Sequence, residues 1–448
     1  MNEEEAPVPI VALTMVLATI VMMVVFFFFV AKKSKEEREK EIEETSATKP
    51  KPKQNQSQNG KQQANKTAKK PFTTKKKAHA TYTHPWLLTT LKGHTSTILD
   101  MDFSQNGKYF ITVAEDRSAL IWSIKNFSHK EHRYIRAAID VDHATRVRFS
   151  PDTKAFLVSL ARKNILRVYR IGKKNDGSIG NFVAAFDFPQ YNQADIRNIG
   201  VASNGRFIMV GYANTTILVV SIKGDILATI DTHQVTNSLA LVSHCGRFIG
   251  SSGFTPDVKV WEVCFDKSLL FKEVSRAFEL KGHSAGVKCF SFNMDSTRMA
   301  SASKDGTWKL WDTDVQYKKQ QDPYLLYTGT FHSNPSHIVM SPDSRTVVMS
   351  HGNKIVVFNT FSKKTEMMME NVHEGSVEGI RFDSNSKYFV SIGDRHVLIF
   401  NNITGYRAAI EELNDKLNQT NSNAVTERIK EQIQEANDAL QEILPKSS

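Results

Sequence analysis

The fold of this chain is decided by residues 282–312, which read GHSAGVKCFSFNMDSTRMASASKDGTWKLWD. Residues 287–292 form an apolar run typical of a strand, and a short polar turn follows it. Residues 299–303 and 307–311 indicate two further strands. The Lys304-Asp305-Gly306 sequence between them is a strong signal for a tight hairpin. The stretch therefore predicts three consecutive antiparallel strands.

The polar turn of this stretch recurs seven times along the chain, as Phe-Ser-Pro-Asp, Phe-Ser-x-Asn-Gly or a variant. The residues that lead into the turns are Phe103, Phe149, Val201, Val242, Phe292, Met340 and Phe382. Spacings of 41 to 52 residues predict an all-β propeller with seven four-stranded blades. A large apolar residue ends each third strand, and we expect these residues to pack between blades: Trp122, Tyr169, Val219, Trp261, Trp311, Phe358 and Phe400.

A pattern of His, Ser or Thr, Asp and Trp occurs in two repeats with the same internal spacing. The His-to-Asp separation is 22 and the Asp-to-Trp separation is 6 in both, and the hydroxyl residue lies ten before the Trp. The two sets are His94, Thr112, Asp116 and Trp122, and His283, Ser301, Asp305 and Trp311. At these residues the chain resembles the WD40 repeat family. The resemblance implies a propeller over residues 84–402, in which each set forms a hydrogen-bonded tetrad that joins three strands.

Two further repeats carry degenerate copies of the tetrad, and repeats 2, 3 and 6 lack most of it. The degenerate copies are His373, Asp394 and Phe400 in the seventh repeat, and His233, Asp257 and Trp261 in the fourth. The residue types of a tetrad are also those of a hydrolase triad, which requires an exposed serine oxygen with the histidine as its base. We favour the structural role. Since the chain also shows no Gly-rich phosphate loop and no zinc-spaced Cys/His cluster, we expect neither an enzyme nor a cofactor.

Residues 10–30 predict a membrane anchor. They carry no charge, and as a helix they reach about 31 Å, enough for a hydrocarbon core of about 30 Å. The acidic start at residues 1–9 and the absence of a small-residue cleavage site argue against a secreted leader. Basic residues follow the span from Lys32 to Lys40 and none precedes it, which favours a lumenal stub at residues 1–9 and a cytosolic propeller.

Other features of the composition bear on the same orientation. The chain has three cysteines, few and odd in number, as in a reducing compartment. Six Asn-x-Ser/Thr matches point the other way, but such matches arise by chance in a chain rich in these residues. The cytosolic orientation is therefore the favoured interpretation.

Residues 31–83 predict a disordered basic linker. They hold 15 Lys/Arg and 6 Glu, a net charge of +9 out of +11 for the chain. A segment this polar buries too little apolar surface to fold, and as a coil it spans on the order of 40 Å. Its lysines are candidates for binding RNA phosphates or anionic headgroups, with a solvated spacer as the alternative. The densest group is Lys69, Lys70, Lys75, Lys76 and Lys77.

Residues 403–448 predict a helical tail. Ile429, Ile433, Ala436, Leu440 and Ile443 are spaced at 4, 3, 4 and 3, which is heptad spacing over about two heptads. A stretch this short favours packing back onto the propeller. Oligomerisation or a partner helix are the alternatives.

The order of anchor, linker, propeller and tail resembles that of membrane-anchored members of the WD40 family. The resemblance implies an endoplasmic-reticulum membrane protein facing the cytosol, with links to an ER-stress kinase, to the translation machinery and to RNA. No DNA partner is expected. The favoured function is a non-enzymatic scaffold. The alternatives are an exchange factor for a small GTPase, which typically carries its anchor at the C-terminus, and a lumenal propeller hydrolase with six blades and a central calcium.

Overall fold

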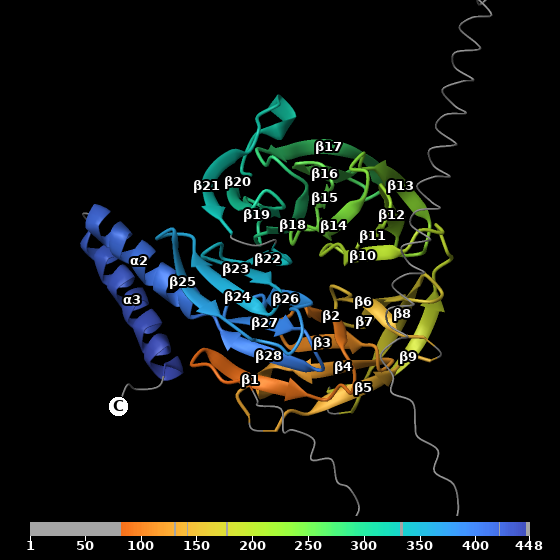
Figure 1. The fold of residues 1–448 in the computed structure, drawn as a ribbon, viewed down its shortest axis with the longest axis horizontal. Helices are drawn as coiled ribbons and strands as arrows, with labels where there is room; N and C mark the ends of the chain where they lie inside the picture. The colour runs from red at the N-terminus through yellow and green to blue at the C-terminus, as the bar shows by residue number, and fades with distance from the viewer. Residues whose placement is uncertain are drawn as a thin grey trace, which may run out of the picture. The chain divides into compact units, whose positions relative to one another are not determined.

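The computed structural model describes residues 82–444, apart from 130, 141, 176–177, 332–334 and 421. These residues form seven four-stranded antiparallel sheets, followed by two α-helices. The sheets surround a common axis, and the innermost strand of each sheet contacts the innermost strands of its neighbours (Figure 1). The all-β, seven-bladed propeller predicted from the repeat is thus confirmed.

Each blade takes its strands in chain order, except for the last blade. Blades 1 and 2 are β2 (Ile98–Phe103), β3 (Tyr109–Ala114), β4 (Ser118–Ser123) and β5 (Tyr134–Ala138), then β6 (Ala144–Phe149), β7 (Ala155–Leu160), β8 (Ile165–Lys173) and β9 (Ile179–Asp187). Blades 3 and 4 are β10 (Ile196–Val201), β11 (Phe207–Tyr212), β12 (Thr216–Ser221) and β13 (Ile226–Asp231), then β14 (Asn237–Val242), β15 (Phe248–Gly253), β16 (Asp257–Phe265) and β17 (Phe271–Lys281). Blades 5 and 6 are β18 (Val287–Phe292), β19 (Arg298–Ser303), β20 (Thr307–Asp312) and β21 (Tyr324–Thr330), then β22 (His337–Met340), β23 (Thr346–His351), β24 (Lys354–Asn359) and β25 (Lys364–Met369). Blade 7 is β26 (Gly379–Phe382), β27 (Tyr388–Ile392), β28 (His396–Asn401) and β1 (Leu87–Lys92).

Blade 7 joins the two ends of the propeller. β1 pairs antiparallel with β28, and Thr90 lies opposite Leu398. The strand that precedes the first repeat is therefore the outer strand of the last blade. Leu91 of β1 is buried in the same cluster as Val390 and Ile399 of blade 7. Backbone pairing between segments about 300 residues apart closes the ring, a contact that costs loop-closure entropy before it is made.

The recurrent turn has one backbone conformation in all seven blades. The fourth residue after the lead residue has a φ between 57° and 69° each time: Gly107, Thr153, Gly205, Gly246, Ser296, Ser344 and Ser386. Glycine adopts this left-handed conformation without strain, which explains the Asn-Gly form of the turn. In blade 1, Asn106 accepts hydrogen bonds from Ser104 Oγ at 2.8 Å and from Lys108 N at 3.0 Å. The same bonds form where Thr153 takes the glycine position: in blade 2, Asp152 accepts from Ser150 Oγ at 2.7 Å and from Lys154 N at 3.0 Å.

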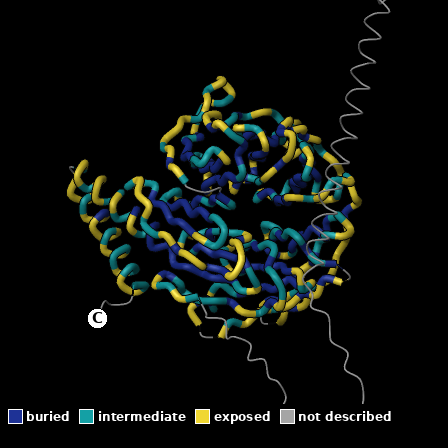
Figure 2. The backbone as a smooth tube through the Cα atoms, in the orientation of Figure 1, coloured by how far each residue is buried: buried dark blue, intermediate teal, exposed yellow. Residues whose placement is uncertain are grey.

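The core lies between the blades. Buried apolar side chains fall into seven clusters in the described part of the chain, and each cluster draws mainly on two neighbouring blades. The seven large residues predicted to end the third strands are at most 8% exposed. Burial of each contributes about 1.5–3 kcal/mol. Figure 2 shows the buried strand centres in contrast to the exposed outer strands.

The tail forms two helices, α2 (Ile403–Gln419) and α3 (Asn423–Ile443). α2 begins directly after β28 and buries Ile403 and Ala408. Leu440 and Ile443 of α3 pack against the cluster between blades 6 and 7. The expectation that the tail packs back onto the propeller is therefore confirmed. Figure 1 shows α2 beside β25, with α3 packed against α2.

Several predictions concern residues outside the described ranges. These are the lumenal stub at 1–9, the anchor at 10–30, nearly all of the linker at 31–83 and its five clustered lysines. Within the described ranges, no helix combines the length and the apolar character needed to cross a membrane.

Candidate functional site

The predicted residues of the first tetrad lie in contact inside blade 1. His94 Nδ1 lies 3.0 Å from Asp116 Oδ2, and His94 Nε2 lies 2.8 Å from Thr112 Oγ1. Trp122 Nε1 donates to Thr112 Oγ1 at 3.1 Å. The chain of bonds links the segment before β2 to β3, β4 and the turn between them. Because His94, Thr112 and Trp122 are buried, these bonds satisfy polar groups that water does not reach.

The second tetrad has the same geometry in blade 5. His283 Nδ1 lies 3.0 Å from Asp305 Oδ2, and Trp311 Nε1 donates to Ser301 Oγ at 2.8 Å. Burial opposes ionisation of Asp305, but hydrogen bonds from Thr307, Ser284 and His283 outweigh it and hold the pKa of Asp305 well below its ordinary value. An ionised Asp305 accepts from Nδ1, so the His283 Nε2 accepts from the Ser301 hydroxyl, at 2.9 Å.

Ser301 is inaccessible, although its hydroxyl points at a histidine as in a hydrolase triad. Its exposed fraction is 0%, and its oxygen accepts the Trp311 indole N–H. Burial also lowers the pKa of His283, which keeps the imidazole neutral. A nucleophile must reach the substrate carbonyl, and this one is covered on every side. The arrangement therefore joins strands and offers no surface for acyl transfer.

The predicted tetrad of blade 4 is wrong at its histidine. The His233 side chain is 75% exposed and lies 3.3 Å from Asp231 rather than from Asp257. The neighbouring Gln234 is fully buried, accepts from Ser251 Oγ at 2.7 Å and donates to the Asp257 carbonyl oxygen. An amide offers both a donor and an acceptor, so it can replace the imidazole. The copy in blade 7 keeps His373, whose Nε2 lies 2.7 Å from Ser391 Oγ.

A second polar group joins blades 1, 2 and 7 near the axis, and sequence reasoning missed it. Arg148 of β6 donates to Asp100 Oδ2 of β2 at 2.6 Å. Arg381 of β26 lies 3.5 Å from Asp102. Burial favours the neutral acid at Asp100, but the nearby Arg148, Arg381 and Arg146 together with a hydrogen bond from Val147 N outweigh burial and lower the pKa of Asp100. One signal in the sequence could have revealed this cluster. Charged residues stand at every second position of the first strand of these blades, and residues two apart in a strand lie on the same face.

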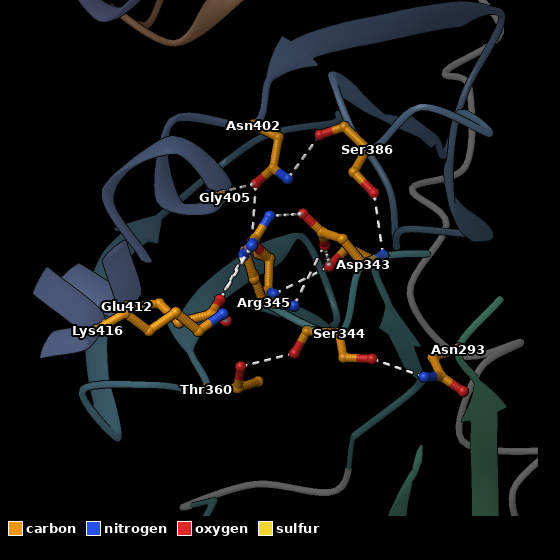
Figure 3. Close-up of polar contacts among 12 residues, drawn as sticks. Asn293, Asp343, Ser344, Arg345, Thr360, Ser386, Asn402, Gly405, Glu412 and Lys416 are labelled. Carbon is orange, nitrogen blue, oxygen red and sulfur yellow. Dashed lines mark hydrogen bonds and ion pairs between the residues drawn. The ribbon is translucent and has the colours of Figure 1, made fainter. Parts of the chain in front are cut away.

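The seven turns share one face of the propeller, here called the turn face, and neighbouring blades form an interblade groove on it. α2 covers the groove between blades 6 and 7. Figure 3 shows Arg345, in the turn of blade 6, facing Glu412 of α2, with the Arg345 Nη2 and Glu412 Oε2 atoms 2.9 Å apart. Nearby, Asn359 donates to Glu411 at 3.1 Å.

Four other grooves are covered by segments that follow the third strand of the next blade. Phe127, after the 3₁₀ turn η1 (Ile124–Asn126), is 1% exposed and packs against Phe110 and Tyr388 in the groove between blades 7 and 1. The remaining covering residues are Tyr317 of η2 (Tyr317–Lys319) between blades 4 and 5, Phe265 and Phe271 of the β16–β17 hairpin between blades 3 and 4, and Ile179 of the β8–β9 hairpin between blades 1 and 2.

The groove between blades 2 and 3 remains open. The segment after β12 is a tight turn, closed by a bond from Ser221 N to Asp225 O, and its Ile222 is 56% exposed. A hollow of about 440 Å³ lies between the two blades. An adjoining hollow of about 610 Å³ is lined by blade 2 alone, and the two share Asp152, Val168 and Phe186. An open, partly apolar groove is the usual form of a ligand site. This groove is therefore the candidate docking site.

Comparison with known proteins agrees with the fold and the tetrads. The family described as WD domain, G-beta repeat matches residues 85–123 and 275–312, which contain the two complete tetrads. Mouse transducin beta-like protein 2 is 48% identical over 386 residues, which cover 86% of this chain and 86% of that protein. The chain belongs to the transducin beta-like protein 2 family. The human protein of that name is 47% identical over 81% of this chain and 82% of its own length. Mouse cilia- and flagella-associated protein 52 is 26% identical over 39% of this chain.

The similarity to transducin beta-like protein 2 extends well beyond the two repeats that match the WD domain family. The likeness extends over most of the chain, whereas the repeat family matches only blades 1 and 5 and their surroundings. Blades 2, 3 and 6 keep the four-stranded form without the tetrad. In these blades, interblade packing and the shared turn maintain the fold.

Proposed function

We propose that this chain is a non-enzymatic scaffold whose propeller docks protein partners. The observation that carries the proposal is the open groove between blades 2 and 3, beside exposed apolar residues of β9. Val183 is 64% exposed and Phe186 is 45% exposed. Exposed apolar side chains beside a groove are typical of interaction sites. The serine and threonine hydroxyls of the tetrads are buried, which favours a structural role for them over a catalytic one.

The proposal extends to the membrane and to RNA on the basis of the sequence. Residues 10–30 anchor the chain in the endoplasmic-reticulum membrane, and the basic residues from Lys32 to Lys40 hold the propeller in the cytosol. The linker lysines bind RNA, and the partners include a stress kinase and the translation machinery. These finer assignments rest on the resemblance to anchored WD40 proteins and on the charge of the linker.

Protease protection tests the orientation. In intact microsomes that contain the full chain, added protease should cleave the propeller and leave a short protected fragment with residues 10–30. The matched variant changes Lys32, Lys33 and Lys35 to Glu. This change should weaken the charge asymmetry that sets the orientation, so that a fraction of the propellers becomes protected from protease. A fully protected propeller in the unaltered chain, with a glycan at Asn126 or Asn214, would contradict the proposal.

Affinity purification with and without RNase tests the docking of proteins. Partners held by the propeller should remain after RNase, and partners held through RNA should be released. If RNase releases every partner, the chain is an RNA-binding protein and its propeller is not a protein-docking platform.

A further inference from the structure

The groove between blades 6 and 7 shows what fits a groove of this propeller. Arg345 precedes β23 and pairs with two carboxylates, Asp343 in its own turn at 3.6 Å and Glu412 of α2 at 2.9 Å. Asn359, at the end of β24, donates to Glu411. Consecutive acidic residues of a helix thus bind at two neighbouring positions on the blade.

Blade 2 has cations at both of the corresponding positions. The bond from Ser150 N to Ala155 O matches that from Ser341 N to Thr346 O, which aligns Lys154 with Arg345. Ala155 lies opposite Arg170, as Thr346 lies opposite Asn359. Arg170 therefore takes the position of Asn359, the residue that binds Glu411 in blade 6.

Arg345 pairs with two carboxylates, whereas Lys154 pairs with only one. Lys154 Nζ lies 3.5 Å from Asp152, the counterpart of Asp343, and its side chain is 70% exposed. Among the described residues, Arg170 and Lys173 have no acidic partner within 4.0 Å. This side of the groove therefore has three cations, Lys154, Arg170 and Lys173, and one carboxylate, Asp152.

Among the seven blades of the described chain, only blade 2 has this pair of cations. Blade 4 has Arg247 and Glu262 at the two positions, which pair with each other at 3.0 Å, and Tyr317 covers them. The groove between blades 5 and 6 also has only a short turn beside it, at residues 360–363 between β24 and β25. Blade 5 has Thr297 and Asp312 at the two positions, so it offers no cation there. The remaining pairs are Lys108 and Ser123 in blade 1, Arg206 and Ser221 in blade 3, and Lys387 and Asn401 in blade 7.

The apolar part of the groove between blades 2 and 3 also matches that of the groove between blades 6 and 7. Val168 and Phe186 face each other across β8 and β9, as Val357 and Met367 do across β24 and β25. On the blade 3 side, Ile222 takes the position of Asn402, at which α2 begins in blade 7. In blade 3 a tight turn follows instead of a helix, so these side chains remain without a cover.

We propose that the groove between blades 2 and 3 binds an acidic amphipathic helix of a partner protein, in the manner in which α2 binds between blades 6 and 7. Apolar residues of the helix cover Val168, Phe186 and Ile222, and two adjacent carboxylates pair with Lys154 and Arg170. This inference rests on the proposed docking function and names the kind of partner for one site.

A peptide titration tests the proposal. The probe is a fluorescein-labelled, end-capped peptide with the sequence of residues 403–419, which contains Glu411 and Glu412, and the target is the purified full chain. Binding, followed by anisotropy, should weaken about tenfold in the double variant Lys154→Glu, Arg170→Glu, because two ion pairs become repulsive. A peptide with both glutamates changed to lysine should bind that variant better than the unaltered chain.

Matched variants decide between the outcomes. Lys108→Glu with Lys125→Glu makes the same change in net charge on exposed residues of blade 1 and should leave binding unchanged. If Arg345→Glu abolishes binding and the blade 2 variant does not, the peptide exchanges with α2 and the proposal is wrong. The proposal is also wrong if the peptide does not bind but polyuridine does, and the double variant Lys154→Glu, Arg170→Glu weakens polyuridine binding. The groove would then be an RNA site. Protein partners that crosslink elsewhere on the propeller would then still support the docking function.

Discussion

Thr346 and Asn402 are 56 residues apart in the chain and share a buried hydrogen bond, with Thr346 Oγ1 donating to Asn402 Oδ1 at 3.0 Å. The same Asn402 oxygen accepts from Gly405 N at the first turn of α2, and the Asn402 amide donates to the Ser386 carbonyl at 2.8 Å. One side chain therefore caps the helix and joins blades 6 and 7. Figure 3 shows Asn402 between Ser386 and Gly405.

Replacement of this residue should detach the tail. Asn402→Ala removes the helix cap and leaves buried polar groups unpaired, so we expect a decrease of about 1–3 kcal/mol in the free energy of unfolding. Ser422→Ala is the control, because Ser422 begins α3 without a side-chain cap bond and should change stability by at most about 0.5 kcal/mol. Chemical denaturation measures both. Equal effects would show that Asn402 has no special role.

The tetrad of blade 5 should behave as one network. His283→Ala and Asp305→Ala should each lower the free energy of unfolding by about 1–3 kcal/mol, because each leaves a buried partner without its bond. The double variant should lose less than the sum, since both residues serve the same network. Additive effects would contradict a shared network. If the variants keep normal stability but lose a hydrolytic activity, the residues form a catalytic triad instead.

The repeat made the propeller predictable because each blade signals its turn and its hairpin locally. Residues 287–292 and 307–311 were expected as strands, and β18 and β20 occupy 287–292 and 307–312. The closure by β1 was not predicted, since nothing within Leu87–Lys92 identifies β28 as its partner. Gln234 was missed because the residue type pointed to His233, whose spacing to Asp257 differs from that of the complete sets, and only the fold shows which of the two side chains is buried.

The grooves were also beyond sequence analysis. Lys154 and Arg170 are 16 residues apart and resemble ordinary surface cations in the sequence. Their significance depends on the register of β7 with β8 and on the length of the segment that follows β12, which belongs to another blade. Contacts between blades are long-range, so a single repeat does not reveal which grooves stay uncovered.

Acid should destabilise the propeller through its buried histidines. Burial, together with the nearby Lys288 and Arg146, lowers the pKa of His337 to about 4 from 6.5. As the pH falls from 7 towards 4, the unfolded chain binds protons that the folded chain does not. The free energy of unfolding should therefore decrease, by at most about 1.4 kcal/mol per pH unit for each such histidine. Thermal unfolding at pH 7.5 and 5.0 measures the effect, which should be smaller in His337→Gln. A stability that rises towards pH 5 would contradict this account.

The linker should bind RNA by charge alone. Changing Lys69, Lys70, Lys75, Lys76 and Lys77 to Gln should weaken binding uniformly across sequences. The log–log salt slope should flatten by about 0.7 for each phosphate of a single strand that the variant leaves without a lysine. Crosslinks confined to residues 84–402, with normal binding by the variant, would leave the linker as a spacer.

The central claim, that the propeller is a protein-docking platform, is tested most directly by site-specific photocrosslinking of the full chain in cells. A photoreactive amino acid at Ile222, Val235 or Tyr324, which are all more than half exposed on three different blades, reports what contacts each position. The account predicts a discrete protein adduct from at least one position, with Ile222 the strongest because it borders the open groove. A folded, correctly located chain that gives no protein adduct from any of the three positions would contradict it.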